Sequence, residues 1–467
     1  MSDISTEISA LQLELPSGME ATTRTEAGSR AWVKAEPAGG RRPTSVEVVP
    51  CRSDTPIEIT YADGITIIVS PRSPSAALEL DRVAGRVRLA QRADGVEVAA
   101  AVIHDVAVLS ARALAAKMDR YEQIGLGQLS WLTAQGQHAP DAVTAAPSPS
   151  SPVLLLLHGT GNTTQGSFGR LLHPGEQETV PSAVWSTIYA AYGGWTWAFD
   201  HPTLGMSPVE NVAVLVDALP EGALLDLLSH SRGGLLADLL AAACDPEVQI
   251  PSDGGAEGDF DGRFRAVAYA AQRKGLRVRT ITRVAAPSQG TTLAGDRLEV
   301  YLHVLLNGLW LAISLGVPNL MPVYAPLREF LIAFVREGQD PTVLPGLAAM
   351  NPEGPFVRWH NGLRRGAASS DHLYAIRGDA LQDGWIQRIA ALLVWTYFRQ
   401  ANDLVVEVSS MDGGPRPRAC HLSRVLSPSD GEKLDHFHYF SHPTVQGWLQ
   451  ALLRAEGPAL PGDFVEG

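Results

Sequence analysis

Short apolar runs recur along the chain from residue 153 onward, and segments with helical spacing lie between them. The run at residues 153–157, VLLLL, is apolar at every position, as in a strand that is buried on both faces of a sheet. Other runs stand at 195–200, 223–229, 278–287, 372–379 and 403–409, with helical segments that include 235–243 and 385–399. Because strands that alternate with helices form parallel sheets, this pattern predicts a doubly wound, mainly parallel α/β domain over residues 153–467.

The chain is long enough for more than this one domain, because 467 residues are about three times a typical ~150-residue domain. Residues 1–44 are polar and predict a flexible leader. Residues 45–134 predict a small β-rich domain with hairpins at Asp63-Gly64 and Asp94-Gly95. Residues 135–152 are rich in Pro, Ser and Ala and predict a linker. Three roles are open for the β-rich domain: binding a protein partner, presenting the chain to a surface, or shielding an edge strand.

Composition narrows the function classes. Hydrophobic residues make up 45% and charged residues 19%, which excludes disorder over most of the length. The net charge of −13 argues against nucleic acid as a partner, because an acidic chain repels phosphate backbones. The three cysteines are far apart and the N-terminus has no signal-peptide pattern, so a cytoplasmic location is expected. No dinucleotide-binding or Walker A pattern is present, so no cofactor is expected.

The sharpest motif lies where an apolar run passes through Ser229-His230-Ser231-Arg232-Gly233-Gly234 into a helical pattern. A nucleophilic serine on a tight strand–turn–helix bend needs small residues two positions before and after it, and Ser229 and Gly233 meet this need around Ser231. The helix N-terminus would favour a developing negative charge there. The alternative is that Ser231 is an ordinary helix cap.

A second motif, His158-Gly159-Thr160, follows the first buried run. A turn of this kind can direct backbone amides at a bound carbonyl oxygen. The sequence predicts an oxyanion hole formed by the amides of Thr160 and Arg232. The alternative is an ordinary glycine-rich turn.

These residues, together with the PSQGTTLA segment that ends at residue 294, resemble the α/β-hydrolase superfamily, and specifically its bacterial lipase and esterase branch. The resemblance covers roughly residues 152–453. It implies a serine hydrolase of carboxylic esters with a Ser-Asp-His triad and a covalent acyl-enzyme. Alternatives are an acyltransferase or thioesterase that uses the same triad, and a catalytically silent binding or scaffold protein.

The resemblance also suggests the other two members of the triad. Asp403, in Asn-Asp-Leu-Val-Val, is the favoured acid, and Asp379 is its competitor. His436, in a loop before the last helical pattern, is the favoured base, and His438 is the runner-up.

Other histidines receive different interpretations. His442 is expected at the surface, and His230 is expected to be packed or near the pocket rim. A metal site formed by Asp435, His436 and His438 is not favoured, because no second ligand cluster accompanies it.

Residues 302–327 carry no charge over a length that could span a bilayer, although Pro318 and Pro322 would interrupt a helix. The segment is interpreted as a buried helical hairpin or as part of a helical cap over residues 300–345. A lid of this composition would suit an acyl ester or lipid substrate and would contact a membrane or lipid interface transiently.

Overall fold

The computed structural model divides into two compact units. Unit 1 comprises Met1–Ala115 and Leu298–Val343, and unit 2 comprises Ala116–Arg297 and Leu344–Gly467. The structure describes residues 10–15, 19–26, 30–37, 48–52, 54–71, 80–83, 86–89, 96–105, 114, 119, 127–173, 180–252, 259–291, 302–303, 306–307, 321–336, 344–366, 372–379, 403, 405–411, 423–427, 434, 436 and 438–457.

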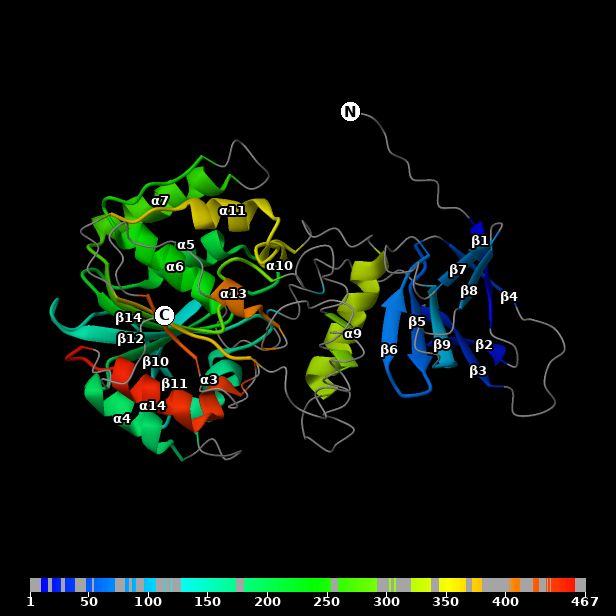
Figure 1. Ribbon diagram of the computed structural model, residues 1–467, viewed down its shortest axis with the longest axis horizontal. Coiled ribbons are helices and arrows are strands. Elements are labelled where there is room, and N and C mark those ends of the chain that lie inside the picture. The colour runs from blue at the N-terminus through cyan, green and yellow to red at the C-terminus, as the bar shows by residue number, and fades with distance from the viewer. Residues whose placement is uncertain are drawn as a thin grey trace. The chain divides into compact units, whose positions relative to one another are not determined.

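Unit 2 is an α/β fold built on an eight-stranded mixed sheet, which confirms the predicted fold class at that level (Figure 1). Its strand order is β11 (His138–Ala142), β10 (Gln128–Leu132), β13 (Thr196–Asp200), β12 (Pro152–Leu157), β14 (Leu224–His230), β15 (Arg277–Val284), β16 (His372–Ile376) and β17 (Ser423–Leu426). The pairs from β13 to β17 are parallel. Five of the six apolar runs are confirmed as strands.

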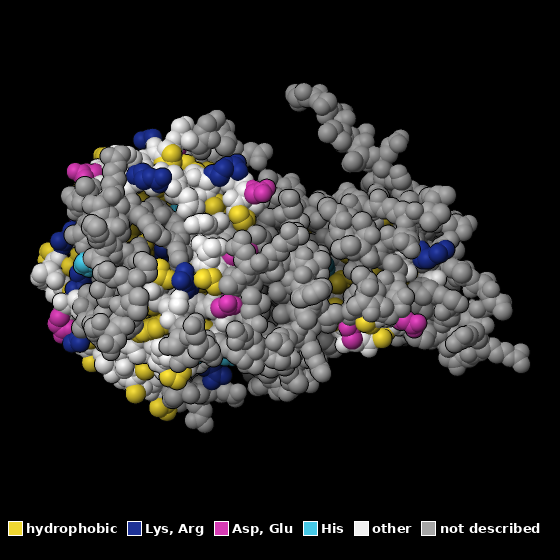
Figure 2. All heavy atoms as spheres, in the orientation of Figure 1, with side chains coloured by type: hydrophobic (Ala, Val, Ile, Leu, Met, Phe, Trp, Pro, Cys, Tyr) yellow, Lys and Arg dark blue, Asp and Glu magenta, His cyan; other side chains and the backbone are white. Residues whose placement is uncertain are grey.

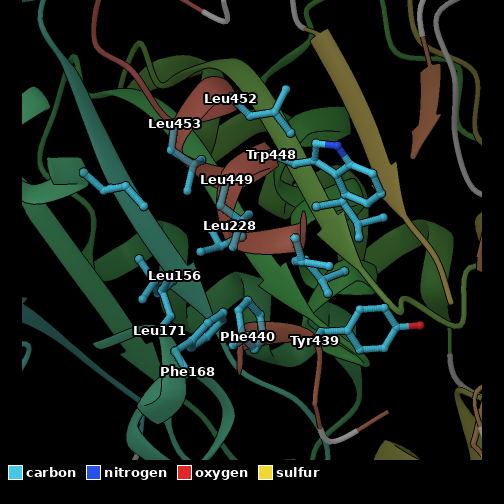
Figure 3. Packing of buried hydrophobic residues seen from close by; sticks show 14 of the residues in the cluster. Leu156, Phe168, Leu171, Leu228, Tyr439, Phe440, Trp448, Leu449, Leu452 and Leu453 are labelled. Atoms are coloured by element: carbon cyan, nitrogen blue, oxygen red, sulfur yellow. The ribbon is translucent and has the colours of Figure 1, made fainter. Parts of the chain in front are cut away.

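Helices cover both faces of this sheet (Figure 1). One group is α5 (Pro208–Ala218), α6 (Gly233–Cys244), α7 (Phe260–Arg273) and α11 (Pro355–Gly362). The other is α3 (Thr164–Leu172), α4 (Ala183–Ala191) and α14 (Pro443–Leu452), and short helices α10 (Pro345–Ala348), α13 (Val408–Met411) and η3 (Tyr439–Ser441) lie in connections. Every residue of β12 is buried, because helices pack on both faces of the strand. Figure 3 shows the apolar cluster that forms on the α3 and α14 side.

One predicted strand of unit 2 is wrong. Asp403, Val405 and Val406 lie in a bend before α13, because the Asp403 carboxylate accepts hydrogen bonds from the N–H groups of Val405 and Val406. A side chain that bonds its neighbours' amides in this way replaces the bonds that a strand would make. The helix expected at 385–399 lies outside the described residues.

The expected linker also differs, because residues 138–142 form β11, which pairs with β10. The two strands are joined by a tight turn in which Gly136 has φ 70° and donates to the Thr133 carbonyl. Gly136 supplies the positive φ at low cost, so a hairpin forms inside a segment whose composition is typical of a linker.

Unit 1 contains two sheets in its described part. The four-stranded sheet has the order β4 (Val48–Arg52), β1 (Ala10–Glu14), β8 (Arg86–Leu89) and β7 (Leu80–Val83). The five-stranded sheet has the order β2 (Met19–Glu26), β3 (Arg30–Pro37), β9 (Val98–Asp105), β5 (Ile57–Tyr61) and β6 (Thr66–Val69). Residues 1–44, expected as a flexible leader, thus contribute three strands, whose polar composition is compatible with the backbone pairing that holds a sheet together.

The edge strand β6 is capped by side chains from the segment at residues 298–343. Asn307 accepts a hydrogen bond from the Thr66 N–H (2.8 Å) and donates one to the Thr66 carbonyl (2.7 Å). His303 Nε2 accepts from the Ile68 N–H at 2.7 Å. Helix α9 (Met321–Arg336) packs beside β6, and its Arg328 forms an ion pair with Glu58 of β5. The described residues of the 302–327 segment thus group with unit 1, and its role as a lid stays a prediction.

On the face drawn in Figure 2, the described acidic and basic side chains are interspersed. Among the described residues, Val180 and Tyr269 are the large hydrophobic side chains that are exposed. No helix in the described part of the chain combines the length and apolar character needed to cross a bilayer.

Candidate active site

Ser231 stands at the bend between β14 and α6. Its φ is 51°, a left-handed conformation that is unfavourable for a residue with a side chain. The Ser231 N–H donates to the Val284 carbonyl of the neighbouring strand at 2.9 Å, and α6 begins two residues later at Gly233. The strand–turn–helix context that the sequence predicts is therefore present, and the serine occupies its strained residue.

The small residues around Ser231 are required by close contacts. A Cβ on Gly233 would lie 2.2 Å from the Leu157 carbonyl oxygen, and one on Gly234 would lie 2.4 Å from the Ala286 Cβ. Ser229 is fully buried, and its Oγ donates to the Thr282 carbonyl at 3.4 Å. The bend can therefore form only because these positions lack large side chains.

The turn after β12 lies against the same serine. A Cβ on Gly159 would be 2.9 Å from the Ser231 Cβ, so the two loops are in close approach. Among the hydrogen bonds of the described residues, neither the Thr160 N–H nor the Arg232 N–H has an acceptor. These two amides are the ones that the sequence assigns to an oxyanion hole.

The buried side chain of His158 holds the turn after β12 in place through two hydrogen bonds. Its Nδ1 donates to the Gly159 carbonyl at 2.9 Å, and its Nε2 accepts from the His201 N–H at 3.0 Å. Burial lowers the pKa of His158, although the nearby Asp200 opposes this effect, so the ring is neutral and structural.

The acid and the base favoured by the sequence are in direct contact. His436 Nδ1 lies 2.8 Å from Asp403 Oδ2, and the His436 backbone N–H donates to the Asp403 carbonyl at 2.9 Å. Because a carboxylate only accepts, Nδ1 carries the proton and Nε2 has a lone pair with which to take another. The Asp403 side chain is fully buried, as an orienting carboxylate requires if it is to hold one imidazole tautomer.

Tyr439 is a partner of Asp403 that the sequence analysis missed. Its hydroxyl donates to Asp403 Oδ2 at 3.0 Å, and Figure 3 shows the ring at the border of the apolar cluster with the hydroxyl directed outward. Asp403 thus accepts from four donors: His436, Tyr439, Val405 and Val406. Residues 436–440, His-Phe-His-Tyr-Phe, contain a signal for this partner, because a buried tyrosine hydroxyl needs a hydrogen-bond acceptor or donor.

The competing residues lie elsewhere. Asp379 is exposed, and its carbonyl accepts from the Leu434 N–H at 3.3 Å. His438 is exposed, and His442 stands at the N-terminus of α14 and is half-buried. The described residues contain no group of three side chains that could hold a metal ion, and Asp435 lies outside them.

The residues on either side of Ser231 are both buried. The ring of His230 lies 5.0 Å from the ring of His436 and 5.4 Å from that of Phe440, which agrees with the packed position expected for it. The Arg232 guanidinium is fully buried and donates to the carbonyls of Met206 and Gly346. Burial lowers the pKa of Arg232 to about 10, although Asp119 and Glu210 oppose the shift. Its side chain thus joins two loops beneath the bend.

Comparisons with known proteins give one family and several structures. The model of DUF7379, a domain of unknown function, matches residues 124–251 and 264–454, which are more than half of the chain and include Thr160, Ser231, Asp403 and His436. No curated protein matches the sequence.

Similar solved structures include lipase 1 from Pelosinus fermentans, at 15% identity and a TM-score of 0.42 over 65% of this chain and 97% of that one. EstA from Clostridium botulinum has 12% identity and a TM-score of 0.42, over 76% of this chain and 100% of that one. The RedJ thioesterase of Streptomyces coelicolor has 15% identity and a TM-score of 0.27, over 67% and 94%. These scores mark limited likenesses in fold.

Proposed function

The chain belongs to the DUF7379 family, and because that description assigns no activity, we propose one from the side chains of the site: a serine hydrolase of carboxylic esters with an α/β-hydrolase-like architecture. The observation that carries the proposal is the 2.8 Å hydrogen bond between His436 and the buried Asp403. A histidine held in this tautomer, in ring contact with the residue that precedes a strained serine, is the arrangement that nucleophilic catalysis uses.

In the proposed reaction, His436 Nε2 takes the hydroxyl proton of Ser231 as its oxygen attacks the ester carbonyl. Asp403 stabilises the imidazolium that forms. The amides of Thr160 and Arg232 donate to the oxyanion, and the N-terminus of α6 adds its dipole. The imidazolium then returns its proton to the leaving alkoxide. Water, activated by the same base, releases the acid and restores the serine.

The experiment is covalent labelling with a fluorophosphonate together with hydrolysis of p-nitrophenyl esters of increasing chain length. We expect the wild type to be labelled and Ser231→Ala to lose both label and turnover. Ser441→Ala is the matched control, because Ser441 is exposed in the loop that carries His436. Absence of label and turnover in the wild type would favour a binding or scaffold role.

The chain-length series also tests the substrate class. We propose esters with long acyl chains as substrates, on the uncharged, apolar composition of residues 302–327. Equal turnover of short and long chains would contradict this part of the proposal. An acyl thioester in the panel tests the thioesterase alternative, in which the same residues act.

A further inference from the structure

We propose that His230 is a positioning residue that ties the oxyanion turn and the base loop together around Ser231. The inference rests on the proposed function and adds to it a residue with no role in the triad. It is based on three hydrogen bonds that run from the His436 carbonyl through the His230 ring and the Ser167 hydroxyl to the Gly159 amide.

The donor and the acceptor of each hydrogen bond on this path follow from its two ends, the His436 carbonyl and the Gly159 N–H. His230 Nε2 lies 3.2 Å from the His436 carbonyl oxygen, which can only accept, so Nε2 carries the ring proton. His230 Nδ1, 3.4 Å from Ser167 Oγ, is then the acceptor of the Ser167 hydroxyl proton. Ser167 Oγ in turn accepts from the Gly159 N–H at 3.1 Å. Each group on the path thus donates in one direction only.

Packing holds the ring of His230 in place. The ring is edge-on to Phe440 at 5.4 Å, and Phe440 contacts Phe168, the neighbour of Ser167 on α3, at 4.8 Å. Burial lowers the pKa of His230 well below its ordinary value, and the adjacent His436 adds to this effect. The ring therefore remains neutral at neutral pH, as the two hydrogen bonds require.

The two ends of the path bear directly on the proposed chemistry. The carbonyl belongs to the base itself, and Gly159 immediately precedes Thr160, whose amide is assigned to the oxyanion. His230 is also the residue next to Ser231 in the sequence. Its side chain therefore links the proposed nucleophile, base and oxyanion donor. A misplacement of about 1 Å among such groups costs about 100-fold in rate.

The first experiment compares His230→Met with His230→Gln. Gln retains an N–H donor near the position of Nε2, whereas Met keeps a similar length without a donor. We expect Met to lower kcat by about 10- to 100-fold with KM within about threefold, and Gln to restore most of the loss. Ser167→Ala is expected to lower kcat as well, because it separates His230 from Gly159.

His438→Met is the matched control, because His438 is an exposed histidine in the same loop, and it should leave kcat within about twofold. The inference is overturned if His230→Met keeps the wild-type kcat, or if Gln is as impaired as Met. If the ring had a purely structural role, His230→Met and His230→Gln would both have a lower unfolding midpoint. Neither variant would then show a fall in kcat at a nearly unchanged KM.

A second measurement does not depend on turnover. Ring nitrogen chemical shifts of the wild-type protein at pH 7 should assign to His230 a neutral ring with the proton on Nε2. A proton on Nδ1, or a charged ring, would overturn the positioning role even in an active enzyme. The predicted tautomer in a protein that neither hydrolyses esters nor takes the label would overturn the proposed function and leave the path intact.

Discussion

Strands β14 and β15 lie side by side in parallel and end in the same backbone bend, yet only one of the bends carries a residue proposed to react. Ser231 has φ 51° and Ala285 has φ 54°, and the residues just before them are paired in register. Each N–H donates to the next strand of the sheet, from Ser231 to Val284 and from Ala285 to Ile376. A left-handed residue at a strand end is thus in itself only a way to turn the chain. It becomes a candidate nucleophile only when a hydroxyl, a helix N-terminus and an imidazole surround it.

The two bends are also supported differently. Beside Ser231, His230 and Ser167 form hydrogen bonds that lead to His436 and to Gly159. Arg283 is the position that pairs with Ser229, and its guanidinium is buried with Asp238 at 2.7 Å. The hydrogen bonds that lead from the Ser231 bend to His436 and Gly159 are neutral, whereas a buried ion pair lies beside the Ala285 bend.

The largest effect on activity is expected from Ser231→Ala, which places an alanine at both bends. Ser231→Ala should lower kcat/KM by at least about 1,000-fold and abolish fluorophosphonate labelling, since the residual rate comes from binding and oxyanion donors alone. Ala285→Ser is the converse variant and should gain no label. Label that persists in Ser231→Ala, or that appears at residue 285, would show that the two bends do not differ in reactivity as proposed.

The next largest effect is expected on the free energy of unfolding, when the Asp238 carboxylate is removed. Asp238→Ala leaves the fully buried Arg283 without its carboxylate, so the free energy of unfolding should fall by about 3–5 kcal/mol. Urea denaturation measures this change. Asp379→Ala, at an exposed carboxylate after β16, is the control and should shift it by less than about 0.5 kcal/mol. Equal effects of the two variants would show that the ion pair does not support the Ala285 bend.

The buried histidine beside this ion pair, His360, should make the stability of the protein sensitive to acid. His360 lies 3.6 Å from Asp238, and burial, with the charge of Arg283 added, lowers its pKa from 6.5 to about 3. Below pH 6.5 the unfolded chain binds a proton that the native ring does not take until about pH 3, so stability falls as the pH drops through this window. His360→Gln should flatten the loss of the urea midpoint between pH 7 and 4.5, and an unchanged slope would contradict this origin. His438→Gln should keep the wild-type slope.

The smallest effect is expected from glycine at the second bend. Ala285→Gly relieves a left-handed conformation that costs about 1–2 kcal/mol, but it increases the entropy of the unfolded chain and removes a buried methyl group. We therefore expect the free energy of unfolding to change by less than about 1 kcal/mol, with turnover retained, as measured by urea titration and the ester assay. A loss of turnover comparable to that of Ser231→Ala would show that the second bend also holds the site.

The sequence predicts much of this sheet because its signals are local. The apolar run before Ser231, the small residues beside it and the helical pattern after it are contiguous, so the strand–turn–helix bend could be recognised directly. The choice of Asp403 and His436 came from a resemblance rather than from spacing, and their hydrogen bond joins residues that are 33 positions apart.

The missed features depend on contacts that no local pattern contains. Ser167 and His230 are 63 positions apart, and neither residue type signals such a partner. Residues 403–409 have the composition of a strand, yet the carboxylate of Asp403 bonds the amides that a strand would use. In the grouping of 298–343 with unit 1, Asn307 and His303 bond a backbone more than 200 residues earlier.

The late position of Asn307 and His303 in the chain matters for biosynthesis. The amides of Thr66 and Ile68 on the edge of β6 find their partners 241 and 235 residues later, at Asn307 and His303. At a ribosomal rate of about 5–20 residues per second, the nascent edge waits on the order of 10–50 s for its caps, with its backbone open to other chains. A truncated product that stops before residue 303 would expose this edge permanently, so its aggregation during expression would follow from two missing side chains.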